Sequence, residues 1–125
     1  MVSSYRDLDV WRLAMKLAEN IYYVTHAFPH RETYALSSQL QRAAVSVASN
    51  IAEGHARGYT KDYLLFIAMA MGSLAELETQ LELSTRLKYV DENDRINYSA
   101  TLTNWDGCYA ACTNHCTLNF RHPSP

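Results

Sequence analysis

Hydrophobic residues recur every three or four positions over most of the chain, which is the spacing of an amphipathic helix. Pro29 disfavours a helical conformation at the residue before it, and Gly54 and Gly58 interrupt the pattern further on. The segments between these breaks predict four helices. The predicted helices cover about residues 9–27, 33–54, 61–88 and 92–118, with frayed ends over 1–6 and 121–125.

The whole chain, residues 1–125, is expected to form a single all-α domain. Its length is enough to bury a core without disulfides or a metal. Helices of this length joined by short connections predict an antiparallel, up-down-up-down four-helix bundle. The fourth helix has the weakest pattern because it is rich in Asn, Thr and Ser, so packing of its apolar seam must fold it.

The most unusual stretch is 36–54, LSSQLQRAAVSVASNIAEG. Its apolar residues have helical spacing, but small and hydrogen-bonding residues crowd its last turns, namely Ser46, Ser49, Asn50 and Glu53. No histidine is placed to activate these serines, and the nearest one in sequence lies in the following connection. The pattern therefore favours a packing and hydrogen-bonding joint against the third helix over a catalytic site.

Gly72 and Ser73 interrupt the middle of the third predicted helix. An interior glycine costs roughly 1 kcal/mol relative to alanine, so we expect another helix to approach closely there. Asn50, Glu53 and Glu76 are candidates to meet between the second and third helices. A structural hydrogen-bond network is then expected, because a buried carboxylate needs a partner.

The net charge of −2 gives the molecule no general attraction for nucleic acids, so a local basic patch would be needed. The best local cluster is Arg57, Tyr59 and Lys61, where cations and aromatic residues alternate, and Arg42 is a more distant candidate. A solvated loop explains the same residues equally well.

The chain shows no strong signal for a membrane. No uninterrupted apolar run approaches the roughly 20 residues that span a bilayer. Arg6, Asp7 and Asp9 stand where a signal peptide would be apolar. We therefore expect a cytoplasmic protein without a membrane partner.

Cys108, Cys112 and Cys116 fall every four residues on one side of the fourth predicted helix. Zinc sites use Cys and His, but usually from two separate segments, so core or interface residues are favoured. No Glu is followed by His three residues later, as a di-iron bundle would require. We predict no metal, no cofactor and no enzymatic activity.

Three segments together carry a family resemblance: YRDLDVW at 5–11, the stretch 36–54, and YTKDYLLFIAMAMGSLAELETQLELSTRL at 59–87. In this order and spacing they resemble the 23S ribosomal RNA intervening-sequence protein family over about residues 5–89. The signature positions in this chain are Ser49, Asn50, Ile51, Ala52, Glu53, Gly54, Gly72, Ser73, Glu76, Leu77, Glu78 and Thr79.

The resemblance implies a left-handed antiparallel four-helix bundle that assembles into a ring-like homopentamer. It also implies kinship with the accessory proteins of diversity-generating retroelements, nucleic-acid binding as a proposed role, and no established enzymatic activity. We therefore expect a non-enzymatic homo-oligomer that contacts RNA or a ribonucleoprotein, with Arg42, Arg57, Tyr59 and Lys61 as candidate contacts. The alternative is a protein-interaction scaffold that does not bind nucleic acid.

Overall fold

The computed structural model describes residues 4–98. This part of the chain is helical and contains no strand, which confirms the predicted all-α class for these residues. Residues 92–98 are helical as well. The elements that precede them are η1 (Tyr5–Asp7), α1 (Asp9–Thr25), η2 (His30–Glu32), α2 (Leu36–Ala56) and α3 (Thr60–Arg86).

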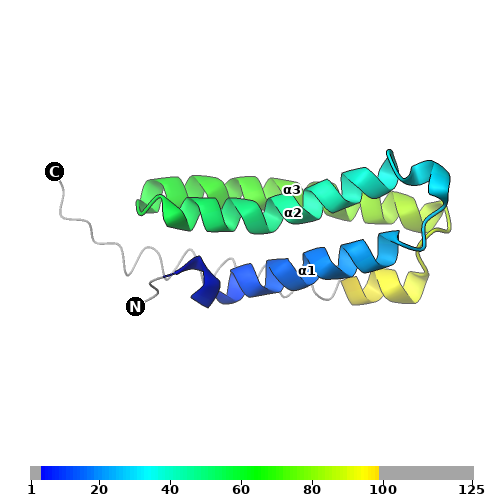
Figure 1. Ribbon diagram of the computed structural model, residues 1–125, viewed down its shortest axis with the longest axis horizontal. Coiled ribbons are helices and arrows are strands. Elements are labelled where there is room, and N and C mark those ends of the chain that lie inside the picture. Colours follow the sequence, from blue (N-terminus) through cyan, green and yellow to red (C-terminus); the bar gives the residue numbers. More distant parts are fainter. Residues whose placement is uncertain (1–3, 99–125) are drawn as a thin grey trace.

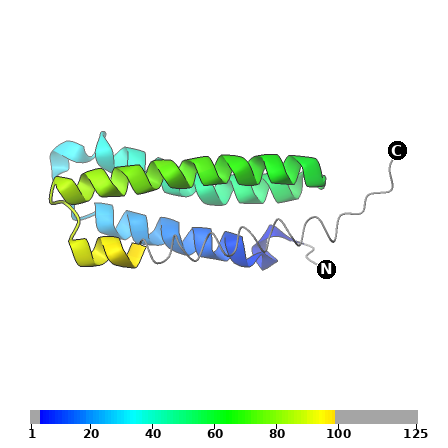
Figure 2. The same cartoon turned by 180° about the vertical axis from the view of Figure 1, so that it is seen from behind.

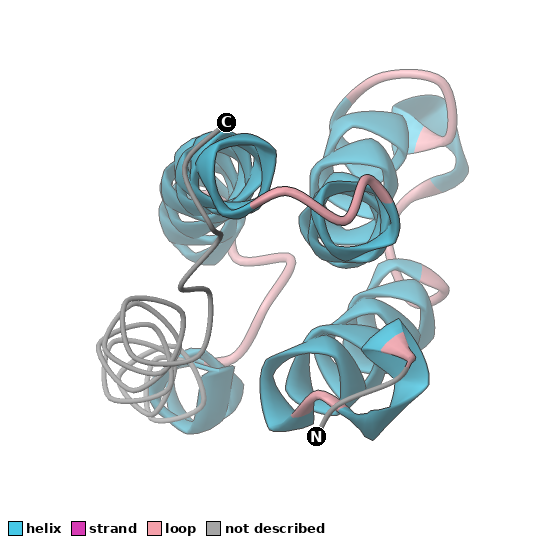
Figure 3. Cartoon of the chain, turned by 90° about the vertical axis from the view of Figure 1, so that its left-hand side faces the viewer, coloured by secondary structure: helices cyan, strands magenta, loops and turns pink. Residues whose placement is uncertain are grey.

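The long helices lie side by side, and α2 is the central member of the described part (Figures 1 and 2). It packs against both α1 and α3, whereas no residue of α1 comes within 8 Å of α3, measured between Cα atoms. The view along the helices separates them into the corners of a bundle (Figure 3). Residues 92–98 lie beside α1 in both side views.

The core follows the apolar seams that the sequence predicts. Leu17, Ile21, Leu40, Ile51 and Leu77 are almost completely buried, at 0–1% exposure. Burying a side chain of this size contributes roughly 1.5–3 kcal/mol, so these seams supply the main force that holds the helices together. Alanines on α1, α2 and α3 are fully buried between the larger residues, and they let the helices approach closely; these are Ala14, Ala44 and Ala70.

Contacts between α2 and α3 show that the two helices run in opposite directions. Gly54 near the end of α2 lies against Phe66 near the start of α3. Further along, Ser46 meets Ser73, with 2.9 Å between the hydroxyl oxygens. Residue numbers therefore rise on one helix as they fall on the other.

The helix α2 begins and ends later than the expected 33–54. Residues 30–32 form the separate turn η2, and Ala35 has a non-helical backbone with φ −119° and ψ −107°. The Glu32 carboxylate accepts the Leu36 N–H at 3.3 Å, which gives one of the first backbone donors of α2 a partner. Gly54 is buried inside the helix rather than ending it, and the positive φ of 76° belongs to Gly58.

The other boundaries differ by one or two residues from those expected. Thr60 has the hydroxyl of a good N-cap residue, but it does not occupy the cap position of α3. The helix starts one residue earlier, so Tyr59 occupies the cap position and makes no side-chain cap bond. The Thr60 hydroxyl is buried without a hydrogen-bond partner in the described chain. The predicted remainder of the fourth helix, 99–118, lies outside the described residues.

Candidate functional site

The signature residue Gly54 allows α2 and α3 to touch. A Cβ atom at Gly54 would lie 2.6 Å from the Cβ of Phe66, which is closer than packed side chains approach, and at an ordinary contact distance of 3.4 Å from the Tyr63 Cα. Glycine is therefore required by the contact between two helices rather than by an unusual backbone angle. The expected packing joint between the second and third helices is present at this residue.

A small hydrogen-bond network continues the joint along α2. The Asn50 amide donates to the Ser46 carbonyl oxygen at 2.9 Å and to its hydroxyl at 3.1 Å. The same hydroxyl lies 2.9 Å from that of Ser73 on α3. Side chains of α2 therefore reach α3 through hydroxyl groups, which explains why small polar residues crowd this part of the sequence.

The predicted meeting of Asn50, Glu53 and Glu76 does not occur, since no hydrogen bond or ion pair joins them in the described chain. Glu53 instead accepts from Arg57 at 3.2 Å, one turn along its own helix. Glu76 accepts from the Gln80 amide at 3.3 Å, also on its own helix. Exposed carboxylates find a partner one turn away at little entropic cost, so no bridge between helices is needed.

Several other signature residues point outward. Ser49 on α2 and Gly72, Glu76, Glu78 and Thr79 on α3 are exposed. A Cβ atom added at Gly72 would meet nothing within 4 Å. The close approach of another helix that was expected at Gly72 does not occur among the described residues.

The basic cluster predicted from the sequence lies at one end of the molecule, around the α2–α3 connection. Arg57, Tyr59 and Lys61 are all exposed, and Tyr59 keeps 62% of its surface. Arg57 is partly neutralised by Glu53, and its guanidinium stacks on the Phe66 ring at 4.7 Å. Arg42 lies about four turns earlier on α2, roughly 22 Å away, so it does not join this cluster.

The fold brings two further cations to this end that the sequence analysis did not assign to it. The turn η1, which carries Arg6, packs against both α1 and α2 and lies toward the same end of the molecule as the α2–α3 connection (Figure 1). Arg12 donates from Nε to the Arg6 carbonyl oxygen at 3.0 Å and forms long, exposed ion pairs with Asp7 and Asp9. The sequence did contain an indication of this position. In an up-down bundle the chain reverses after each helix, so the end of the second helix returns to the level of the start of the first.

We name Arg6, Arg12, Arg57 and Lys61 the basic end. Among the described residues, Arg6 and Lys61 have no carboxylate within ion-pair distance. Aromatic rings lie next to these cations: Arg6 stacks on Tyr5 at 5.7 Å, and Tyr5 packs edge-on against Trp11 with 5.3 Å between ring centroids. Cations interleaved with aromatic rings are typical of surfaces that hold single-stranded nucleic acid.

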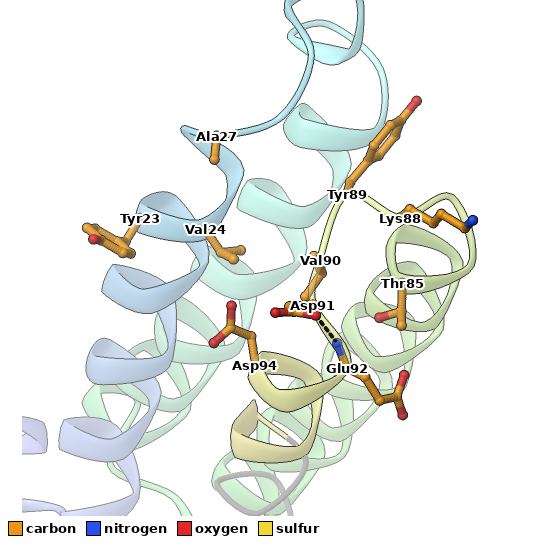
Figure 4. Close-up of a pocket in the computed structure, with 10 residues that line it drawn as sticks. All are labelled: Tyr23, Val24, Ala27, Thr85, Lys88, Tyr89, Val90, Asp91, Glu92 and Asp94. Atoms are coloured by element: carbon orange, nitrogen blue, oxygen red, sulfur yellow. Dashed lines mark hydrogen bonds between the residues drawn. The ribbon is translucent and has the colours of Figure 1, made fainter.

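The opposite end of the molecule has an acidic cleft. A cavity of about 610 Å³ opens between the end of α1 and residues 88–94. Figure 4 shows Asp94 directed toward α1 across this cleft, with Val24 and Val90 on its walls and Lys88 pointing away. Burial raises the pKa of the nearby Tyr98 hydroxyl, and the charge of Asp94 adds to the effect.

The described residues give no sign of a metal site and only a weak sign of a membrane-spanning helix. No group of three or more metal-ligating side chains occurs within residues 4–98, and Cys108, Cys112 and Cys116 lie outside them. The helix α3 is long and apolar enough to cross a bilayer by length and composition alone. Core helices of soluble proteins meet the same criterion, so this weak signal does not replace the expectation of no membrane partner.

These features define a small all-helical protein in which the helices α2 and α3 meet at a joint of small and polar residues. The model of the family described as 23S rRNA-intervening sequence protein matches residues 6–106. The chain therefore belongs to this family, as its sequence motifs indicated. A search of curated proteins finds no match. The family description names an RNA context and no reaction.

Proposed function

We propose that this protein is a non-enzymatic, cytoplasmic homo-oligomer, most simply a pentameric ring, that contacts RNA or a ribonucleoprotein through its basic end. Each subunit is then a left-handed, antiparallel four-helix bundle. The observation that carries the proposal is the exposed cluster of Arg57, Tyr59 and Lys61 at the α2–α3 connection. The turn η1 and the start of α1, which carry the exposed residues Arg6 and Arg12, lie toward the same end of the fold. The family to which the chain belongs supplies the RNA context.

A single basic end is a weak ligand for RNA, because Asp7, Asp9 and Glu53 pair with two of its cations. Repetition changes this balance. In a ring built around one rotation axis, equivalent ends lie at the same height, so every copy presents its Arg6 and Lys61 to one side. Linked weak sites bind a long RNA with much greater avidity than one site alone.

The proposal is tested by measuring the affinity of the full-length protein for a single-stranded fragment of 23S rRNA over a range of salt concentrations. We expect binding at low salt that weakens steeply as salt rises. For single strands, each phosphate contact contributes a slope of about −0.7 to the logarithmic plot. The variant Arg6→Ala/Lys61→Ala is expected to bind more weakly and to show a shallower slope.

A matched control removes two cations from the other end, as Arg31→Ala/Lys88→Ala, and should bind like the wild type. Loss of affinity in this control equal to that of Arg6→Ala/Lys61→Ala would contradict the assignment to the basic end. Absence of RNA retention by the wild type at low salt would refute RNA contact itself. Recovery of one stoichiometric, nuclease-insensitive protein partner would then favour the scaffold alternative.

A further inference from the structure

A continuous row of exposed residues runs along the outer side of α3. We name it the α3 stripe; its members follow one another at steps of four, three, four, three and four. This is the spacing of a helix–helix contact seam, although no helix of the described chain covers it. The α3 stripe consists of Leu65, Met69, Gly72, Glu76, Thr79 and Leu83, and its three large apolar members are 59%, 49% and 47% exposed in that order.

The glycine in the middle of the α3 stripe makes no close contact with another helix within residues 4–98. Gly54 on α2 is closed by Phe66, but the space around Gly72 is open to at least 4 Å. A helix-interior glycine lowers helix stability by roughly 1 kcal/mol relative to alanine. An exposed backbone of this kind is suited to close approach by a helix that is not part of the same chain.

The composition of α3 is also more apolar than its burial requires. It contains an 18-residue window apolar enough for a bilayer, yet only 33% of that window is buried. The exposed apolar residues of α3 include Leu65, Met69 and Leu83 of the α3 stripe. Contiguous exposed apolar surface commonly marks a site where a protein meets a partner.

A second apolar patch lies on a different side of the molecule, over α1 and α2. A hydrogen bond from the Gln41 amide to the Thr25 hydroxyl at 3.0 Å marks the side of α2 that faces α1. Val45 lies one turn after Gln41 on that side, and Tyr22 lies one turn before Thr25. The α1–α2 patch consists of Met15, Tyr22 and Val45, which are 39%, 51% and 43% exposed.

Charges beside the two surfaces are complementary. Glu76 lies within the α3 stripe and Glu78 next to it, and neither has a cation within ion-pair distance in the described chain. Arg42 lies one turn before Val45 on α2 and likewise forms no ion pair there. Acidic groups thus border one apolar surface and a cation borders the other, which favours their mutual contact.

We infer that the α3 stripe of one copy packs against the α1–α2 patch of the next copy, which makes this the subunit interface of the proposed homo-oligomer. The inference rests on the proposed self-association and names its surfaces. An interface between two different patches leaves one of each free after every addition, so it continues until a ring closes. Contact between identical stripes would stop at a dimer.

The test breaks each surface separately and measures the mass of the full-length protein by native mass spectrometry and light scattering. Met69→Glu should remove the α3 stripe and leave the α1–α2 patch intact, and Val45→Glu should do the reverse. Each variant alone is expected to be monomeric. Mixed together, they should form a 1:1 heterodimer, because one intact stripe meets one intact patch.

Controls keep the outcome interpretable. Ile96→Glu changes an apolar residue of 55% exposure outside both surfaces and should assemble like the wild type. Far-UV circular dichroism checks folding, and Leu65→Glu with Tyr22→Glu provides a second pair if either first variant fails to fold.

Three results would overturn the inference, and they separate it from the proposed function. If the Met69→Glu and Leu65→Glu variants keep the oligomeric mass of the wild type, the protein still self-associates but this interface is refuted. Dimers of Val45→Glu alone, absent with Met69→Glu, would show stripe-to-stripe contact instead. A wild type that is monomeric refutes both proposals, and its sedimentation with phosphatidylcholine vesicles would identify a bilayer as the partner of α3.

Discussion

The two sides of α3 carry the same kinds of residue but stand in opposite environments. On the side toward α2, Leu77 is fully buried, the Ser73 hydroxyl meets Ser46, and Phe66 fills the space that Gly54 leaves. On the outer side, Leu83 is 47% exposed and Gly72 faces open space. Leu77 is therefore enclosed by the core, whereas Leu83 stays half exposed and Gly72 meets no other helix among the described residues.

This difference divides the family signature into two groups. Asn50, Gly54 and Ser73 take part in the joint between α2 and α3, so the fold of a single copy explains them. Gly72 and Glu76 lie on the outer side, where no other helix of the described residues packs on them. The signature of the family thus contains residues that join α2 to α3 and residues that no other described helix contacts.

The largest effect is expected from removing equivalent apolar groups on the two sides. Leu77→Ala should lower the free energy of unfolding by about 2–5 kcal/mol, because it leaves a cavity in the core. Leu83→Ala should change it by less than about 0.5 kcal/mol in a single copy. Both are measured by urea unfolding in the Met69→Glu background, which separates folding from assembly. Equal losses would contradict the contrast between the two sides.

A smaller effect of opposite sign distinguishes the two glycines. Gly54→Ala should destabilise the chain by about 1–3 kcal/mol, since its Cβ would clash with the Phe66 Cβ and force the helices apart. Gly72→Ala in the Met69→Glu background should stabilise it by up to about 1 kcal/mol, because nothing opposes the added methyl group. Thermal unfolding provides the measurement, and destabilisation by Gly72→Ala would show that the outer side is not open.

The smallest effect concerns an exposed ion pair away from both sides of α3. A hydrogen bond from Arg95, reinforced by its charge, holds the pKa of the Glu92 carboxyl below its usual value of 4.5. Stability from this group is present above the unfolded-state pKa and is lost as pH falls through the lowered folded-state value. Arg95→Gln should return the pKa of Glu92 toward 4.5 in an NMR titration. The control Arg86→Gln changes a residue that pairs with Glu82 and should leave the pKa of Glu92 unchanged.

Helix periodicity was sufficient to predict the all-α class and the residues of the core, because burial of one helical face leaves a repeating signal along the chain. Helix ends were harder to place. Thr60 has the chemistry of an N-cap, yet the chain enters α3 one residue earlier. Glycine often ends a helix, but Gly54 lies inside α2, where it makes room for Phe66 of α3. The sequence around Gly54 does not indicate this contact, because Phe66 is on another helix.

The candidate site was only partly predictable for the same reason. Arg57, Tyr59 and Lys61 are neighbours in sequence, so their cluster was visible without a structure. Arg6 joins them only because η1 packs on α2, which no local pattern indicates. Arg42 was grouped with them by charge alone, and distance along the helix separates it.

By itself the sequence determined which faces of the helices are apolar, and its motifs indicated the family. Both depend only on the spacing of residues that are close together in the chain. Tertiary structure decided which polar and small residues meet, since such contacts depend on how neighbouring helices are aligned. It joined Ser46 to Ser73 and Arg6 to the basic end, and it left Glu53 and Glu76 apart. Within residues 4–98 it also leaves the α3 stripe exposed, because α2 can cover only one side of a helix that is apolar on two.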